Sequence, residues 1–487
     1  MNEIIATSND ELPDHLTKGG PGDKFLGGGR VNTSEWFVNK TLQRNLKQIQ
    51  VDNASWYPEG SDKLEQQIKD EEIWFCGAPF QMLYTSVGGR FAPCSWACGE
   101  EFNVSIQDTD INDFFINNEG MNKLRTEMLT PGSDLTFAKE SCQDCLRQEK
   151  IYGRSRRQAS LKIQSNNEDF WPNMHNAVNR FKVSGKGHIE DRIFEVQIKA
   201  FGNECNFDCY MCFPFDSTVR IKSMDSDIMD GQNVWDDFSL MGADKNKVER
   251  VRDKPIEDII EQIVKVAPYI RHLKLIGGEP LVMAKYYQLM EAVIATGHGP
   301  EISIKYQTNM SVLTSGKYDI RDYLSHFQRF EFTVSLDGIG SANDYIRRRS
   351  NWENIVNNIK EVKKYPKVTV CVNGTITFLS VMRFYQLIEW FDDNIELFDQ
   401  INWSNIRRPE KLCANVLPDQ LKKELISKYE GFPDIQNVLK ESNNGVGHQD
   451  AIDYLLMQDK QYKDTKWESK LFDVFPELEQ YHNQSEG

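Results

Sequence analysis

The segment Phe201-Gly-Asn-Glu-Cys205-Asn-Phe-Asp-Cys209-Tyr-Met-Cys212 decides how the rest of the chain is interpreted. Its C-x3-C-x2-C spacing places three thiols on one compact loop. Three thiolates can hold three irons of a cubane and leave the fourth iron without a protein ligand, whereas a purely structural cluster usually takes a fourth cysteine. The spacing therefore predicts an iron–sulfur loop with one open position. A zinc site that borrows another ligand is the alternative, and the nearest histidines are His188 and His272.

Strand-like segments begin just before this loop and alternate with helix-like segments. The predicted strands are Ile193–Lys199, His272–Ile276, Ile302–Gln307, Phe330–Leu336, Val368–Asn373 and Asp399–Trp403. The predicted helices are Ile256–Ala267, Tyr286–Ala295, Ile320–Phe327, Trp352–Lys364 and Val381–Phe391. This alternation is typical of an α/β fold with parallel strands and right-handed crossovers. Either an open doubly wound sheet or a partial barrel would place the active site at the carboxyl ends of the strands.

Several segments near those strand ends match one family when taken together with the cysteine loop. They are Leu275-Ile-Gly277-Gly278-Glu279-Pro280, Tyr306-Gln307-Thr308-Asn309, Val334-Ser335-Leu336-Asp337-Gly338, Asp344-Tyr-Ile-Arg347 and Asn373-Gly374-Thr375-Ile376. In this order they resemble the motifs of the radical S-adenosylmethionine (SAM) superfamily. The resemblance covers about residues 192 to 410 and implies a partial (βα)6 barrel.

The resemblance also implies a cluster and a SAM site. Cys205, Cys209 and Cys212 would be the catalytic ligands of a [4Fe–4S] cluster. The implied SAM contacts are Met211, Gly277, Gly278, Glu279, Pro280, Asn309, Ser335, Asp337, Arg347 and Asn373. In the family, the residues corresponding to Glu279, Ser335 and Arg347 meet the SAM ammonium, ribose and carboxylate. Met211 stands where many members carry an aromatic residue, and its soft apolar side chain can pack against adenine in the same way.

The implied reaction is reductive cleavage of SAM to methionine and a 5′-deoxyadenosyl radical, which then abstracts hydrogen from a substrate. The cofactor performs the difficult chemistry, and the protein orients the reactants. A reducing partner such as flavodoxin or ferredoxin is expected. We favour a peptide or protein as substrate, with a small molecule or RNA as alternatives. A non-catalytic metal-binding protein on the same fold is a further alternative, although Glu279, Ser335, Asp337 and Arg347 are all present.

A second set of cysteines precedes the loop. Cys76, Cys94, Cys142 and Cys145 follow the pattern C-x12-G-x4-C, then C-x2-C, which resembles the auxiliary-cluster module of SPASM and twitch radical SAM enzymes. Phe80, Leu83, Tyr84 and residues 88–93 resemble its β-hairpin. The resemblance implies a second [4Fe–4S] cluster on these four cysteines, in a module that usually follows the core rather than preceding it. Zinc bound by Cys94, Cys98, Cys142 and Cys145 is the alternative, and Cys98 could instead replace one cluster ligand or be a free thiol.

These patterns divide the chain into five parts. We expect a flexible polar segment over residues 1–69, a small cysteine-rich α+β module over 70–150 and a linker over 151–191. The radical SAM core would follow over 192–415 and a helical extension over 416–487.

Composition narrows the possible partners and location. The 487-residue chain is 39% hydrophobic and 27% charged, with a formal net charge of −16. Nucleic-acid binding needs a concentrated basic surface, so RNA is disfavoured. No long apolar run predicts a membrane span, and Met1–His15 lack the features of a secretory signal. We therefore expect a reducing cytoplasm, where ten cysteines are more often metal ligands or catalytic groups than disulfides.

Overall fold

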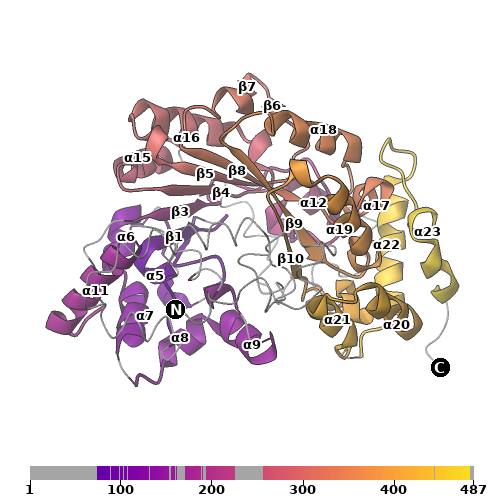
Figure 1. Ribbon diagram of the computed structural model, residues 1–487, viewed down its shortest axis with the longest axis horizontal. Helices are drawn as coiled ribbons and strands as arrows, with labels where there is room; N and C mark the ends of the chain where they lie inside the picture. Colours follow the sequence, from indigo (N-terminus) through magenta and orange to yellow (C-terminus); the bar gives the residue numbers. More distant parts are fainter. Residues whose placement is uncertain are drawn as a thin grey trace, which may run out of the picture.

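The computed structural model describes most of the chain from residue 74 onward. The described residues are 74–87, 89–97, 99–102, 104–106, 108–130, 132–152, 155–158, 161, 170–187, 189, 193–224, 256–443 and 445–482. The expected flexible segment over 1–69, Cys98, His188 and Gly88 lie outside them. The central feature is an eight-stranded sheet in the order β10-β9-β8-β5-β4-β3-β1-β2 (Figure 1).

The strand bounds agree closely with the sequence pattern. The sheet consists of β1 Met82–Thr85, β2 Phe91–Ala92, β3 Glu195–Ile198, β4 His272–Leu275, β5 Ser303–Thr308, β8 Arg329–Ser335, β9 Val368–Ile376 and β10 Gln400–Asn405. Strands β3, β4, β5, β8, β9 and β10 correspond to the six predicted strands, and all their pairings are parallel. The chain therefore forms a mixed α/β fold around a mostly parallel sheet.

Helices connect most of these strands. They are α12 Thr218–Met224, α15 Ile256–Val266, α16 Ala284–Ala295, α17 Gly340–Ile346, α18 Trp352–Val362 and α19 Phe384–Asp393. One predicted helix, Ile320–Phe327, is wrong, because only a short 3-10 turn, η6 Ile320–Asp322, forms there. A two-stranded hairpin, β6 Thr314–Ser315 and β7 Tyr318–Asp319, takes up this connection. The Asp319 side chain accepts from the Arg321 backbone N–H, which closes the turn at 3.0 Å.

The two faces of the sheet differ in chemistry. Residues that pair across parallel strands project from the same face, and successive residues alternate between faces. One paired row is apolar and buried: Val196, Leu273, Ile304, Phe330 and Val368. The next row is polar: Gln197, Lys274, Lys305, Glu331 and Thr369. In Figure 1, α15, α16 and α18 lie along one side of the sheet.

The N-terminal cysteine-rich residues share the sheet of the core. Strand β1 pairs in parallel with β3 and antiparallel with β2, so the predicted hairpin forms the sheet's outer edge. Its helices are α5 Ala78–Gln81, α6 Ile111–Asn117, α7 Glu119–Leu129, α8 Thr136–Ser141 and α9 Gln143–Tyr152. The predicted linker contains a further helix, α11 Phe170–Ser184. One continuous hydrophobic core runs from Phe75 to Leu478.

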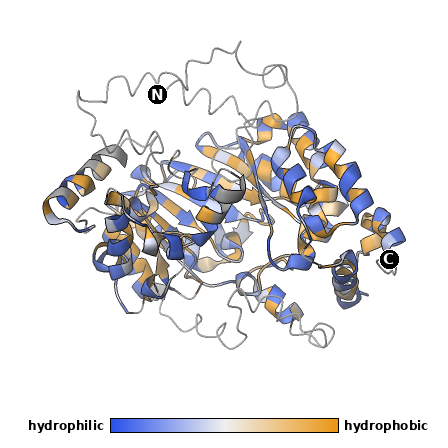
Figure 2. Cartoon of the chain, turned by 90° about the horizontal axis from the view of Figure 1, so that it is seen from below, coloured by the Kyte–Doolittle hydropathy of each residue, from blue (hydrophilic) through white to orange (hydrophobic). Residues whose placement is uncertain are grey.

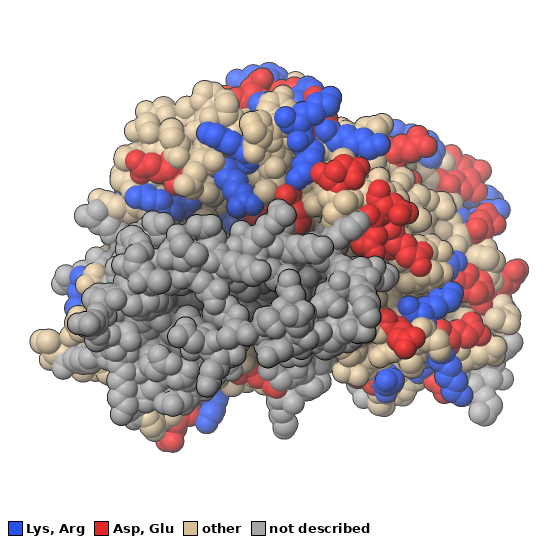
Figure 3. All heavy atoms as spheres, in the orientation of Figure 1, with Lys and Arg blue, Asp and Glu red and all other residues tan. Residues whose placement is uncertain are grey.

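Helices follow Pro418, as the pattern predicts. They are α20 Asp419–Lys428, α21 Pro433–Lys440, α22 His448–Tyr462 and α23 Leu471–Val474. Figure 2 shows hydrophobic and hydrophilic residues on the helices around the sheet. Among the described residues, no helix has the length and apolar character needed to cross a membrane. On the face shown in Figure 3, Lys and Arg side chains lie close to Asp and Glu side chains.

Candidate functional site

The cysteine loop lies at the carboxyl end of β3, where the fold predicts a functional site. Its backbone is held from two sides. The Glu279 N–H donates to the Glu204 carbonyl at 2.7 Å, and the Thr218 N–H donates to the Asn203 carbonyl at 2.9 Å. The Cys212 N–H also donates to the Cys209 carbonyl at 2.9 Å. These contacts fix the loop against the turn after β4 and the start of α12.

Gly278 allows one of these contacts. A Cβ at this position would lie 2.3 Å from the Glu204 carbonyl oxygen and 2.5 Å from the Asn203 carbonyl oxygen. Backbone atoms cannot easily give way, so only glycine fits. The sequence predicts that the glycine pair lets backbone approach a ligand, and the structure shows the close approach of Gly278 to the cysteine loop itself. At Gly277 the nearest atom is Sδ of Met283, at 3.0 Å, which is the end of a flexible side chain.

The three thiols of the loop interact electrostatically with one another. Cys209 is buried, whereas Cys205 and Cys212 are half-buried. Burial raises the pKa of Cys205 to about 12 and that of Cys209 to about 11, and it raises the pKa of Cys212 well above its usual value. Without a metal these thiols are protonated at neutral pH. A metal centre would have to displace the protons, because the thiolate is the ligand form.

Arg347 lies beside this loop. Its Nη1 is 3.8 Å from Sγ of Cys209, and its Nη2 is 2.8 Å from Oδ2 of Asp337. Oδ1 of Asp337 accepts from the Thr375 N–H at 2.6 Å. Burial raises the pKa of Asp337, while the Arg347 guanidinium opposes that rise. In the described part of the chain, Nε of Arg347 is buried and has no hydrogen-bond partner, an arrangement that is costly unless a ligand supplies an acceptor.

Glu279 is almost completely buried, and three donors hold its carboxyl group. Oε1 accepts from the Leu281 N–H at 3.0 Å and from the Thr308 hydroxyl at 2.6 Å. Oε2 accepts from the Asn309 N–H at 2.6 Å. Burial raises the pKa of Glu279 to about 7. A carboxylate offers about four acceptor positions, so one position remains for the ammonium group that the sequence predicts as its partner.

The remaining predicted SAM contacts lie at the same edge of the sheet. Ser335 ends β8 and pairs with Asn373 on β9, which pairs with Asn402 on β10. Asn309 directly follows β5, and its Nδ2 donates to Oδ1 of Asn206 in the cysteine loop at 2.9 Å. Two further predicted SAM contacts are Met211 and Pro280. Met211 lies within the cysteine loop and packs against the hydrophobic core. Pro280 begins the 3-10 turn η4 Pro280–Val282, directly after Glu279.

The structure also brings cysteines of the N-terminal set together. Cys76 interacts electrostatically with Cys94 and Cys145, and Cys145 interacts with Cys94. Burial raises the pKa of Cys76 to about 12 and that of Cys145 to about 11. Cys142 immediately precedes α9, one helical turn before Cys145. All four predicted ligands thus lie around the β1–β2 hairpin and the start of α9, while Cys98 lies outside the described residues.

A single tetrahedral metal ion and a cubane make different demands on such sites. Zinc–sulfur bonds are about 2.3 Å long, so all the sulfurs of a zinc site must converge on one point. The cysteines of a cubane bind different irons and can lie farther apart. Within the residues that the structure describes, no three His, Cys, Asp or Glu side chains converge closely enough to hold one ion. The three-thiol loop, the open Glu279 position and the unpartnered Arg347 Nε fit a cluster together with SAM.

A buried network of an ion pair and hydrogen bonds, which the sequence did not predict, holds the cysteine loop. Asp208 and Arg220 form a buried ion pair of 3.2 Å, and the Tyr462 hydroxyl donates to Asp208 at 2.7 Å. The Tyr454 hydroxyl donates to the Tyr210 carbonyl at 3.0 Å. Both tyrosines belong to α22, so the C-terminal helices fasten the cysteine loop. No local sequence signal could have revealed contacts between residues so far apart in the chain.

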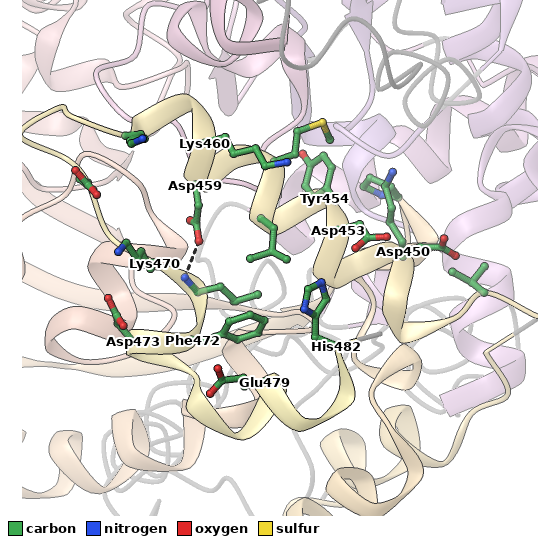
Figure 4. A pocket seen from close by; sticks show the side chains of 18 of the residues that line it. Asp450, Asp453, Tyr454, Asp459, Lys460, Lys470, Phe472, Asp473, Glu479 and His482 are labelled. Atoms are coloured by element: carbon green, nitrogen blue, oxygen red, sulfur yellow. Dashed lines mark hydrogen bonds between the residues drawn. The ribbon is translucent and has the colours of Figure 1, made fainter. Parts of the chain in front are cut away.

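A separate cleft of about 1370 Å³ lies among the C-terminal helices. Figure 4 shows Asp459, Lys460 and Lys470 among its lining residues. Oδ2 of Asp459 accepts from the Leu471 N–H at 2.6 Å. Carboxylates and lysines both line the cleft, and the three loop cysteines are not part of its wall. It is therefore distinct from the cysteine site.

Comparison with known proteins finds one family across this region. The model of the radical SAM superfamily matches residues 200–385, which include the cysteine loop, Glu279, Asn309, Ser335, Arg347 and Asn373. The chain therefore carries a radical SAM superfamily domain, the domain of enzymes that use SAM and an iron–sulfur cluster. No curated protein matches the chain.

Proposed function

We propose that the protein is a radical SAM enzyme whose Cys205, Cys209 and Cys212 hold a [4Fe–4S] cluster. The observation that carries this proposal is the position of Arg347, which contacts Cys209 and Asp337 at once inside the matched domain. When bound, the cluster supplies the electron that cleaves SAM into methionine and a 5′-deoxyadenosyl radical. A flavodoxin or ferredoxin would deliver that electron in a reducing cytoplasm, and none of the nine described cysteines forms a disulfide.

We assign the SAM-binding roles as follows. The buried Nε of Arg347 is a donor for the SAM carboxylate, and the carboxylate of Glu279 is an acceptor for the ammonium. Ser335 and Asn373 form one paired row at the sheet edge, and we assign them to the ribose and adenine. Gly277, Gly278 and Pro280 shape the turn that holds Glu279. Three further residues complete the proposed site. Asn309 donates a hydrogen bond to Asn206 in the cysteine loop, Asp337 orients Arg347, and Met211 packs on adenine.

The N-terminal cysteines form the second part of the proposal. Cys76, Cys94, Cys142 and Cys145 would hold an auxiliary [4Fe–4S] cluster, which the electrostatic contacts among Cys76, Cys94 and Cys145 support. Zinc is the competing occupant. Metal analysis of anaerobically purified protein separates the two, because two clusters require about eight irons per chain, while the zinc alternative predicts about four irons and one zinc.

A peptide or protein is the substrate class we propose. The resemblance of the N-terminal cysteine set to modules of peptide-modifying enzymes supports it. The polar face of the sheet supports it as well, because buried Gln197, Thr333, Asn373 and Asn402 offer hydrogen-bonding groups suited to peptide amides. Oε1 of Gln197 is buried and has no hydrogen-bond partner among the described residues, so an apolar substrate would leave it unpaired, at a cost of about 1–3 kcal/mol.

Spectroscopy tests the proposed SAM site directly. Anaerobically reconstituted protein, reduced with dithionite, should give the EPR signal of a [4Fe–4S]+ cluster, and SAM should change that signal. Cys209→Ala should remove the SAM-dependent change, whereas Cys413→Ala should keep it. Cys413 is a suitable control because its thiol donates to the Ile406 carbonyl at 3.3 Å and belongs to neither cysteine set. If the addition of SAM left the EPR signal of the wild-type protein unchanged, the proposal would be contradicted.

A further inference from the structure

An ion pair joins the segment that follows the cysteine loop to the carboxyl end of β3. Nζ of Lys199 lies 2.5 Å from Oδ1 of Asp216. Lys199 directly follows β3, and its backbone N–H donates to the carbonyl and hydroxyl of Thr85 on β1, at 3.1 and 3.2 Å. Asp216 ends the 3-10 turn η2 Pro214–Asp216, which begins two residues after Cys212. The pair is therefore built from elements that the sheet and the loop hold in place.

Both partners act electrostatically on Cys212. Lys199 interacts with Cys212 and with Tyr84, which neighbours the N-terminal Cys94. After burial, the Asp216 carboxylate is the largest influence that raises the pKa of Cys212. The side chains of Lys199 and Asp216 are 16% and 31% exposed, so solvent screens their charges less than those of a surface pair.

These charges have opposite consequences for a cluster on the loop. Reduction adds one negative charge to a thiolate-bound cluster, and nearby charges and hydrogen bonds set its potential. A cation beside Cys212 favours the reduced cluster, and an anion there favours the oxidised cluster. We propose that Lys199 and Asp216 set the reduction potential of the cluster held by Cys205, Cys209 and Cys212, with Lys199 raising it and Asp216 lowering it. This inference rests on the proposed function and adds two tuning residues outside the ligand set.

Single and double variants of the full chain test this assignment. The reconstituted proteins are titrated with redox mediators without SAM, and the reduced cluster is measured by EPR. Lys199→Met should lower the midpoint potential, and Asp216→Asn should raise it. Each should change the ratio of reduced to oxidised cluster about tenfold at fixed potential, or about 59 mV for one electron. The double variant should lie between the single variants, and Lys199→Arg should stay close to the wild type.

The chain offers a matched control pair. Lys363 and Asp399 also lie 2.5 Å apart, with 19% and 33% exposure, but neither is among the groups that influence the loop cysteines. Lys363→Met should therefore leave the midpoint potential unchanged. Tyr84→Phe removes a hydroxyl without removing a charge and should also leave it unchanged.

Opposite shifts distinguish charge tuning from a merely structural role. Shifts in the same direction for Lys199→Met and Asp216→Asn, or no shift in either, would overturn the inference. If Lys199→Met fails to hold its cluster, Asp216→Asn decides alone, and anything other than a rise overturns the inference. Failure of the proposed function has a different signature: the wild-type protein and Cys209→Ala would then show the same cluster signal.

Discussion

Arg347 and Asp337 form a buried ion pair, with Nη2 of the arginine 2.8 Å from Oδ2 of the aspartate. The pair leaves Nη1 of Arg347 facing Cys209 and leaves Nε without a partner among the described residues. One guanidinium thus joins the end of β8 to the cysteine loop and keeps one N–H donor available. A free guanidinium N–H can donate a charge-assisted hydrogen bond to a carboxylate.

Replacement of this guanidinium should weaken SAM binding. Arg347→Lys keeps the positive charge but loses the fork that lets one side chain meet several partners. We expect at least a tenfold rise in the SAM dissociation constant, or about 1.4 kcal/mol, measured anaerobically by calorimetry on cluster-loaded protein. Arg348→Lys is the neighbouring control, because Arg348 instead pairs with Asp459 at 2.6 Å. Equal loss of SAM affinity in both variants would contradict the assigned role.

The contact between Gly278 and the cysteine loop predicts a severe effect of one methyl group. In Gly278→Ala the new Cβ would meet backbone carbonyls at 2.3 and 2.5 Å. Overpacking of this kind costs about 1–3 kcal/mol. We expect a lower melting temperature and less iron bound per chain. Gly277→Ala should be milder, since its closest contact would be the flexible Met283 side chain at 3.0 Å and its other contacts would be at 3.5 Å or more. The opposite ranking in thermal unfolding would disprove this packing argument.

The support of the loop by the C-terminal helices can be measured as stability. Asp208→Ala would leave Arg220 as a buried, uncompensated charge, a loss of about 3–5 kcal/mol. Tyr462→Phe removes the hydrogen bond to Asp208, worth about 1.5–3 kcal/mol, and a longer one that the hydroxyl accepts from Nε of Arg349 at 3.3 Å. Chemical denaturation should therefore rank Asp208→Ala as the more destabilised variant. If Tyr462→Phe proved equally unstable, the ion pair would not dominate this network.

Glu279 should make the stability of the SAM-free protein depend on pH. Burial raises its pKa from 4.5 to about 7 in the folded protein. Between these values the folded state holds a proton that the unfolded state has lost, so stability falls as pH rises, by up to about 1.4 kcal/mol per unit from this group. Glu279→Gln should remove this part of the slope, as judged from denaturation at pH 5, 6 and 7. A wild-type stability that is no more pH-dependent than that of Glu279→Gln would contradict the raised pKa.

Local patterns predicted the features that depend on local chemistry. The alternation of strand-like and helix-like segments located β3, β4, β5, β8, β9 and β10, and the cysteine spacing located the loop. The predicted helix over Ile320–Phe327 was wrong because the hairpin ending at Asp319 competes for the same connection. The pairing of β1 with β3, the Asp208–Tyr462 contact and the Lys199–Asp216 pair depend on where distant segments meet. Periodicity and spacing carry no information about such meetings, so only the structure could show them.

Production of 5′-deoxyadenosine tests the central claim most directly. Cluster-loaded protein is incubated anaerobically with SAM and dithionite, and the product is quantified by mass spectrometry per chain. The account predicts 5′-deoxyadenosine and methionine from the wild type and from Cys145→Ala, and none from Cys205→Ala, Cys209→Ala or Cys212→Ala. Absence of 5′-deoxyadenosine from wild-type protein with an intact, reduced cluster would contradict it.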